Sequence, residues 1–174
     1  MVYIGVLWNT VNHLREEILQ DTNNFGKVIN YFDCDLGKDY NNFVRKIYQS
    51  DGIAEWKVDL KLQAMNITPS THLTIFFIDI DDSEKELNDR KHKIVSVNME
   101  RMKNSIRNKY SQMIQNYFFD NVFHMTDDET ELANTLEVIK EYFPNIYNEY
   151  FEIKEDTNVR IRRKNGKGAD KNED

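Results

Sequence analysis

The chain has 174 residues, of which 40% are hydrophobic, so it is long enough for one domain with a substantial core. A net charge of −7 argues against a nucleic-acid partner, which needs clustered lysines and arginines, and no apolar run reaches the roughly 18 residues of a membrane-spanning helix. The single cysteine, Cys34, can form no internal disulfide, so we expect a cytoplasmic protein with neither a membrane nor a nucleic-acid partner.

The first half of the chain alternates between apolar runs typical of strands and stretches with helical spacing. The clearest strand is Thr71 to Ile80, whose continuous apolar centre predicts a central place in a sheet. In chain order we predict a strand at Val2 to Trp8, a helix capped by Asn9-Thr10, a strand at Lys27 to Leu36 and a helix from about Asp39. The spacing at Ile53 to Met65 suits either a helix or a strand, and we favour a helix.

The second half predicts helices more than strands. A charged loop at Ser83 to Lys93 leads to a long helix, in which Val95, Met99 and Ile106 recur at helical spacing. A strand at Asn121 to His124 and a helix from Asp128 to Phe143, ended by Pro144, complete the order.

This order of elements is close to the split βαβ arrangement of ferredoxin-like proteins. We therefore predict an α+β fold, with an antiparallel sheet of at least four strands and helices packed on it, as a single domain over residues 1–156. Residues 157–174 are predicted to form a basic and then polar C-terminal tail, disordered from Asn165 onward because almost no apolar side chain remains there.

The segment from Asn121 to Asp127, which follows the pair Ile106-Arg107, is the most informative for function. An apolar run that ends in His124, before a hydroxyl residue and an acid, is typical of a strand that delivers a side chain to a cleft where a helix begins. Helix starts favour anions, and Lys103 and Arg107 lie four residues apart on one helix face. These features predict a phosphate site, although a strand-end histidine is also commonly a hydrogen-bonded scaffold residue.

The same segment resembles the second half of the nucleoside diphosphate kinase family, where Ile-Arg precedes an Asn-apolar-apolar-His strand, Ser/Thr-Asp and a Glu-containing helix. The resemblance implies the fold of that family, a phosphoryl-accepting role for His124, and phosphate contacts from Arg107 and Thr126. Lys103 joins these candidates through its spacing from Arg107. The implied partner is a nucleotide or another phosphorylated small molecule, with Mg²⁺ arriving with the nucleotide, and a homo-oligomer is compatible with the resemblance.

The chain differs from the family pattern in several places, one of which is the absence of the family's Gly- and Pro-containing loop before the Ile-Arg pair. The chain has Trp8-Asn9-Thr10 where the family has Lys-Pro-Asp, and Met125 where the family has a glycine, so a bulky thioether is expected to narrow the phosphate site. Phosphoryl transfer depends mainly on positioned charge around the moving group. Two functions therefore stay open: a nucleotide-dependent phosphotransferase that uses His124, or a catalytically inactive nucleotide-binding or regulatory module on the same fold.

We predict no metal site made of side chains. Asp79 and Asp81 share one strand face beside Asp82, but a polar strand end accounts for this pattern. Mg²⁺ at nucleotide sites is commonly held by phosphates and water, so it needs no dedicated set of carboxylates.

Overall fold

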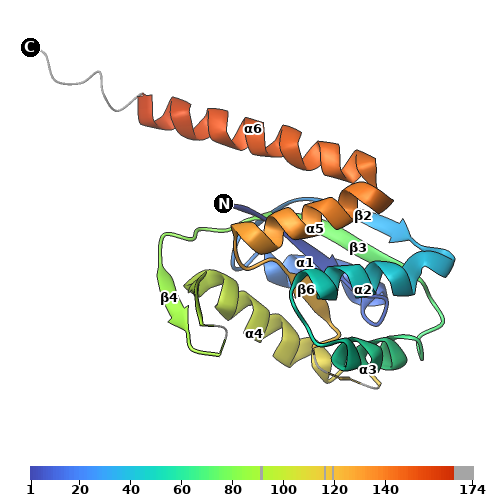
Figure 1. Cartoon of the computed structure of the whole chain (residues 1–174). Coiled ribbons are helices and arrows are strands. Elements are labelled where there is room, and N and C mark those ends of the chain that lie inside the picture. Colours follow the sequence, from blue (N-terminus) through green and yellow to red (C-terminus); the bar gives the residue numbers. More distant parts are fainter. Residues whose placement is uncertain (91, 116, 119, 167–174) are drawn as a thin grey trace, which may run out of the picture. The chain divides into compact units, whose positions relative to one another are not determined.

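A computed structural model describes residues 1–90, 92–115, 117–118 and 120–166 of the chain. It divides into two compact units, residues 1–138 and the residues from 139 onward. In the first unit four strands form one antiparallel sheet with helices packed on it, so the predicted α+β class is confirmed and is compatible with a ferredoxin-like arrangement. The strands are β1 (Val2–Leu7), β2 (Lys27–Asp35), β3 (His72–Asp79) and β6 (Phe123–Met125), in the order β2-β3-β1-β6 (Figure 1).

The two inner strands, β3 and β1, carry the pattern expected of strands covered on both faces. β3 pairs with β2 on one side and with β1 on the other, so its predicted central position is confirmed. The chain crosses over β3 on its way from β1 to β2 and over β1 on its way from β3 to β6. The first crossover contains a 3₁₀ turn, η1 (Asn12–Leu14), and α1 (Arg15–Thr22), and the second contains α4 (Val97–Ser111).

One face of the sheet packs against α1 and α4. Period-two alternation sends Tyr3 and Leu7 of β1 to this face, where they join Met102 and Ile106 of α4. Gly5 lies between those two β1 residues, and a Cβ there would come within 2.2 Å of the Phe76 ring. A side chain at this position would therefore push the strands apart.

The helical segments between β2 and β3 are η2 (Gly37–Asp39), α2 (Tyr40–Ser50) and α3 (Glu55–Met65), so the predicted helices from about Asp39 and at Ile53 to Met65 are confirmed. Phe43, Val44 and Ile47 of α2 are fully buried, as their helical spacing indicates. Tyr48 completes this stripe and packs against Trp8 with 5.6 Å between the ring centroids.

A bulge in β2 changes one part of the predicted strand pattern. Strict alternation places Val28 on the same face as Asn30 and Phe32, but the register against β3 shifts between Val28 and Asn30. Val28 consequently packs with the α1 and α4 core, whereas Phe32 contacts Phe77 with 5.4 Å between ring centroids. One extra residue in a strand reverses the faces of those that follow.

The prediction of a charged loop at Ser83 to Lys93 is wrong, because this stretch contains the first strand of a hairpin. β4 (Lys85–Asn88) pairs with β5 (Lys93–Ser96) as a separate two-stranded sheet. Val95 thus belongs to a strand instead of α4, which begins after Ser96, whose side chain accepts a hydrogen bond from the Met99 amide. Leu87 and Ile94 pair across the hairpin and are both exposed, so the amphipathic signal of a strand is absent.

The residue types of Asn9 and Thr10 predicted a cap for the first helix, but in the structure neither residue caps it. The Asn9 side chain donates to the carbonyls of Met65 and Ser70 at 3.0 and 2.9 Å, and Thr10 donates to the Asn121 carbonyl at 2.6 Å. These polar side chains therefore hold distant loops together.

Two further helices follow the sheet. α5 (Glu129–Tyr142) ends before Pro144 as predicted, but Pro144 also opens α6 (Pro144–Gly166), because proline is tolerated in a first helical turn. The helix continues ten residues into the predicted tail of residues 157–174, whose last eight positions lie outside the described residues. Among the described residues, no helix is both long and apolar enough to cross a membrane.

Candidate functional site

A cavity of about 490 Å³ lies beside β6 in the first unit. β6 is at the end of the sheet order, so its side opposite β1 pairs with no other strand of the described chain. Elements from both sides of the sheet reach this edge. The cavity is lined by Tyr48, Asp51, Ile53, Lys57, Lys61, Arg90, Lys93, Lys103, Arg107, Asp120, Phe123, His124, Met125, Asp127 and Glu131.

The lining of this cavity is basic although the protein is acidic. Six of its side chains are lysine or arginine and four are aspartate or glutamate, which gives a formal difference of +2. The whole chain carries a formal charge of −7. Because the cations are concentrated where the surface is hollowed, the cavity favours an anionic ligand.

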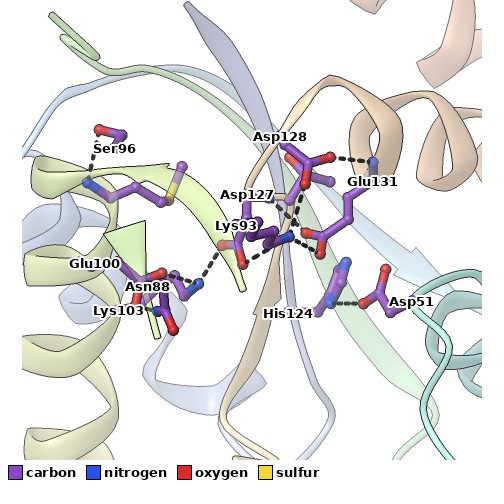
Figure 2. Close-up of polar contacts among 12 residues, drawn as sticks. Asp51, Asn88, Lys93, Ser96, Glu100, Lys103, His124, Asp127, Asp128 and Glu131 are labelled. Atoms are coloured by element: carbon purple, nitrogen blue, oxygen red, sulfur yellow. Dashed lines mark hydrogen bonds and ion pairs between the residues drawn. The ribbon is translucent and has the colours of Figure 1, made fainter. Parts of the chain in front are cut away.

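His124 lies at the centre of β6 and faces away from the α1 and α4 core. Its ring packs edge-on against Tyr48 with centroids 6.1 Å apart, and its Nδ1 atom lies 3.3 Å from Asp51 Oδ2 (Figure 2). Its side chain is 6% exposed, and its buried Nε2 atom makes no hydrogen bond within the described part of the chain.

Asp51 lies next to His124 because α2 ends at Ser50, directly before Asp51. Asp51 is the C-cap residue of α2, and Gly52 follows with a φ of 69°, a left-handed conformation that glycine adopts without strain. The carboxylate favours the tautomer with its proton on Nδ1, which leaves a lone pair on Nε2.

Burial lowers the pKa of His124 to about 3, so the imidazole is neutral at physiological pH. The carboxylate of Asp127 opposes this shift, while the positive charges of Arg107, Lys103 and Lys61 add to it. A neutral imidazole with a free lone pair can act as a nucleophile or as a hydrogen-bond acceptor.

One wall of the cavity is a chain of ion pairs. Lys103 is 2% exposed and pairs with Asp127 and, at 2.7 Å, with Glu100. Lys93 lies 2.8 Å from Asp128 and 2.5 Å from Glu131 (Figure 2). Burial alone would lower the pKa of Lys93, but the hydrogen bonds with these two carboxylates raise it well above its ordinary value.

At the start of α5, backbone amides donate hydrogen bonds to side-chain carboxylates of the same segment. The Glu131 amide donates to Asp128 Oδ1 and the Asp127 amide donates to Glu131 Oε2, both at 2.8 Å. Thr126 is fully buried and bonds to the backbone of Ile4 through both its amide and its hydroxyl. These groups are thus occupied within the fold, and the structure does not bring Thr126 into the cavity lining.

Met125 belongs to the cavity lining, but its side chain does not lie on the same face of β6 as His124. Side chains alternate along β6, so Met125 points to the face opposite His124 and belongs to the α1 and α4 core. Its sulfur lies within 2.4 Å of the place where a Cβ on Gly5 would stand. The missing side chain of Gly5 therefore creates the space that Met125 fills.

A second wall of the cavity is formed by Arg107 of α4 and Lys61 of α3. The Arg107 guanidinium lies 5.3 Å from the Phe123 ring centroid, and its nearest carboxylate is Asp120, with Nη1 at 3.7 Å. Its Nε is buried and makes no hydrogen bond within the described residues. Lys61 is 6% exposed and lies over the Tyr48 ring, with Nζ 4.6 Å from its centroid.

Of the four residues predicted for the site, the structure therefore brings His124, Arg107 and Lys103 together. Sequence reasoning missed Asp51, Lys61 and Lys93. The only signal for Lys61 was its spacing of four residues from Lys57, which places both on one side of a helix. Nothing in the sequence could indicate that Asp51 would meet a residue 73 positions away.

Within the described residues, no group of three or more histidine, cysteine, aspartate or glutamate side chains could hold a metal ion. The sequence matches no family model, and a comparison with curated proteins found no significant match. The geometry of the cavity must therefore carry any functional conclusion.

Proposed function

We propose that the cavity beside β6 binds the phosphate groups of a nucleotide or of another phosphorylated small molecule. The observation that carries this proposal is the concentration of six lysine and arginine side chains around one cavity in a protein of net charge −7. Phosphate is the common biological anion that such a cluster suits, and arginine adds a planar fork of donors. Mg²⁺ would enter with the nucleotide, held by phosphates and water.

We further propose that His124 accepts a phosphoryl group from a nucleoside triphosphate, on a fold like that of the nucleoside diphosphate kinases. The Nε2 lone pair of the neutral imidazole would attack the γ-phosphorus while the bond to the β–γ bridging oxygen breaks, which releases the diphosphate. Asp51 would then stabilise the positive ring through Nδ1, and a second substrate would take the phosphoryl group in a ping-pong reaction.

Incubation with γ-labelled ATP tests this chemistry. The wild-type protein should acquire label that survives alkali and is lost in acid, as phosphohistidine is, whereas His124→Gln should acquire none. His72→Gln is the matched control, because His72 is 46% exposed and lies outside the cavity lining. Equal labelling of the His124 variant would remove this residue from the mechanism.

A second candidate is a nucleotide-binding or regulatory module without turnover. The burial of the Nε2 atom favours it, because a nucleophile must be approached along a line that this conformation closes. Lys93 and Lys103, each bound to carboxylates, are also poorly placed to follow a moving phosphoryl group. Saturable ATP binding by calorimetry, with neither label on the protein nor ATP consumption, is the result expected for this candidate.

A further inference from the structure

The helix α3 carries two different rows of side chains next to each other. Lys57 and Lys61 are four residues apart, so they lie on one side of the helix, and both line the cavity. Trp56 and Leu60 are also four residues apart, one step around the helix from the lysines, and both are exposed. An apolar face of α3 therefore adjoins the basic side that meets the cavity.

The exposure of Trp56 is high for a residue of its size. Its relative exposure is 57%, whereas Trp8, the only other tryptophan of the chain, is fully buried. An indole is among the largest apolar groups that a fold can cover, so it contributes most to stability where it is buried. The described part of the fold leaves this contribution unused at Trp56.

Lys57 connects the exposed indole with the cavity. Its Nζ atom lies 5.4 Å from the centroid of the Trp56 ring, and the same lysine belongs to the cavity lining. Trp56 itself is outside the lining, so its ring lies at the rim. An aromatic surface beside clustered cations is the combination that binds nucleotides, because the base stacks on the ring while the cations contact phosphate.

The size of the apolar face indicates the kind of ligand that it suits. The face contains two side chains, and the residues between and beside them along α3 are charged: Glu55, Lys57, Asp59 and Lys61. A stable protein–protein interface buries roughly 800 Å² on each partner, which two side chains cannot supply. A nucleobase, in contrast, needs only one aromatic ring.

We infer that Trp56 is the stacking platform for the base of a nucleotide whose phosphates occupy the cavity beside β6. This inference rests on the proposed function and narrows its ligand from any phosphorylated small molecule to one with an aromatic base. Every base has a flat π-face, so Trp56 would supply affinity without selecting among bases.

Calorimetric titration with ATP and, separately, with inorganic tripolyphosphate tests the inference, because tripolyphosphate has neither base nor sugar. Trp56→Ala should bind ATP about tenfold more weakly than the wild type does and should bind tripolyphosphate equally well. Trp56→Phe should keep most of the affinity for ATP, because a phenyl ring also stacks. Tyr31→Ala should bind ATP as the wild type does. It is the matched control, since Tyr31 is an exposed aromatic residue of β2, at the opposite end of the sheet order from β6.

Tryptophan fluorescence gives a second readout, since the chain contains only two tryptophans. ATP should quench the emission of the wild type, and tripolyphosphate should not. Trp56→Phe should bind ATP without this quenching. Quenching that persists in Trp56→Phe would mean that the signal comes from Trp8, which would overturn the stacking on Trp56.

The binding results separate the inference from the proposed function. If ATP binds and Trp56→Ala binds it as tightly as the wild type does, the inference is wrong and the proposed function stands. Equal weakening of ATP and tripolyphosphate would also overturn the inference, since Trp56 would then act through the shape of the cavity. If tripolyphosphate binds and ATP does not, the phosphate site stands without a base site. Binding of neither ligand would overturn both.

Discussion

The two walls of the cavity each contain a buried lysine, and the two lysines are held in opposite ways. Lys103 is 2% exposed and lies between Glu100 and Asp127. Lys61 is 6% exposed and lies over an aromatic ring, with a pKa lowered to about 8 because burial outweighs its compensation. The first lysine completes a structural ion pair. The second lies in the cavity lining against an aromatic ring, where Asp120 only partly opposes the effect of burial on its pKa.

The strongest test of this comparison is to replace each of the two lysines, Lys103 and Lys61, by methionine. Lys103→Met should destabilise the protein by about 3 to 5 kcal/mol, because the carboxylate of Asp127 would stay buried after the loss of this ion-pair partner. Urea denaturation at pH 7 measures the change. Adding Asp127→Asn should restore part of the loss, and a change below about 1 kcal/mol would mean that the ion pair contributes little.

The histidine between the walls should make the protein sensitive to acid. The pKa of His124 is about 3 in the folded protein and about 6.5 in the unfolded chain, so the neutral ring stabilises the fold fully above pH 6.5 and progressively less as the pH falls toward 3. Between pH 7 and pH 4.5 this group should account for a loss of about 3 kcal/mol.

Urea denaturation of His124→Gln at both pH values checks this loss. The variant should lose less stability than the wild type over this interval, and His72→Gln should behave as the wild type does, because His72 is 46% exposed. The same acid loss in the His124 variant would show that other groups cause it.

Lys61→Met should change the free energy of unfolding in the opposite direction to Lys103→Met. The pKa of Lys61 is lower in the folded protein than in the unfolded chain, so the charged form costs stability below pH 8 and this cost disappears as the pH rises toward 10.5. Removal of the amine should therefore stabilise the protein by about 3 kcal/mol at pH 7, less the contact with the Tyr48 ring. Thermal unfolding at pH 7 and pH 10 should show a gain that shrinks with pH, whereas a clear loss at pH 7 would place Lys61 in the same class as Lys103.

The smallest effect is expected at the C-terminal end of the chain. Removal of residues 165–174 should leave the thermal midpoint unchanged, because Ala169 is the only residue among them with a wholly apolar side chain. Calorimetry in one buffer at one concentration measures this. A drop in the midpoint would mean that this end of the chain contributes to the folded state.

Much of the fold could be predicted because each long element has its own periodicity. The apolar run of β3 and the helical stripe of α2 are local patterns, and both elements lie where they were predicted. The hairpin of β4 and β5 escaped prediction because it buries little, with Leu87 and Ile94 exposed. Its strands are held by backbone pairing, which leaves no mark on side-chain composition.

The candidate site was predicted in part. The approach of Lys103, Arg107 and His124 follows from one helix face and one strand end. Asp51 and Lys61 come from a different region of the chain, and their residue types alone do not distinguish them from ordinary surface charges.

The sequence by itself determined the class of fold, the central place of β3 and the presence of His124 in the strand before α5, because hydrophobic spacing is a local property. Only the tertiary structure decided that Thr126 bonds to β1, that Met125 fills the space at Gly5, and that Lys61 and Arg107 line one cavity beside β6. These outcomes depend on which side of a strand or helix meets another element. Packing between residues far apart in the chain sets that choice, and with it the set of charged side chains that line the cavity.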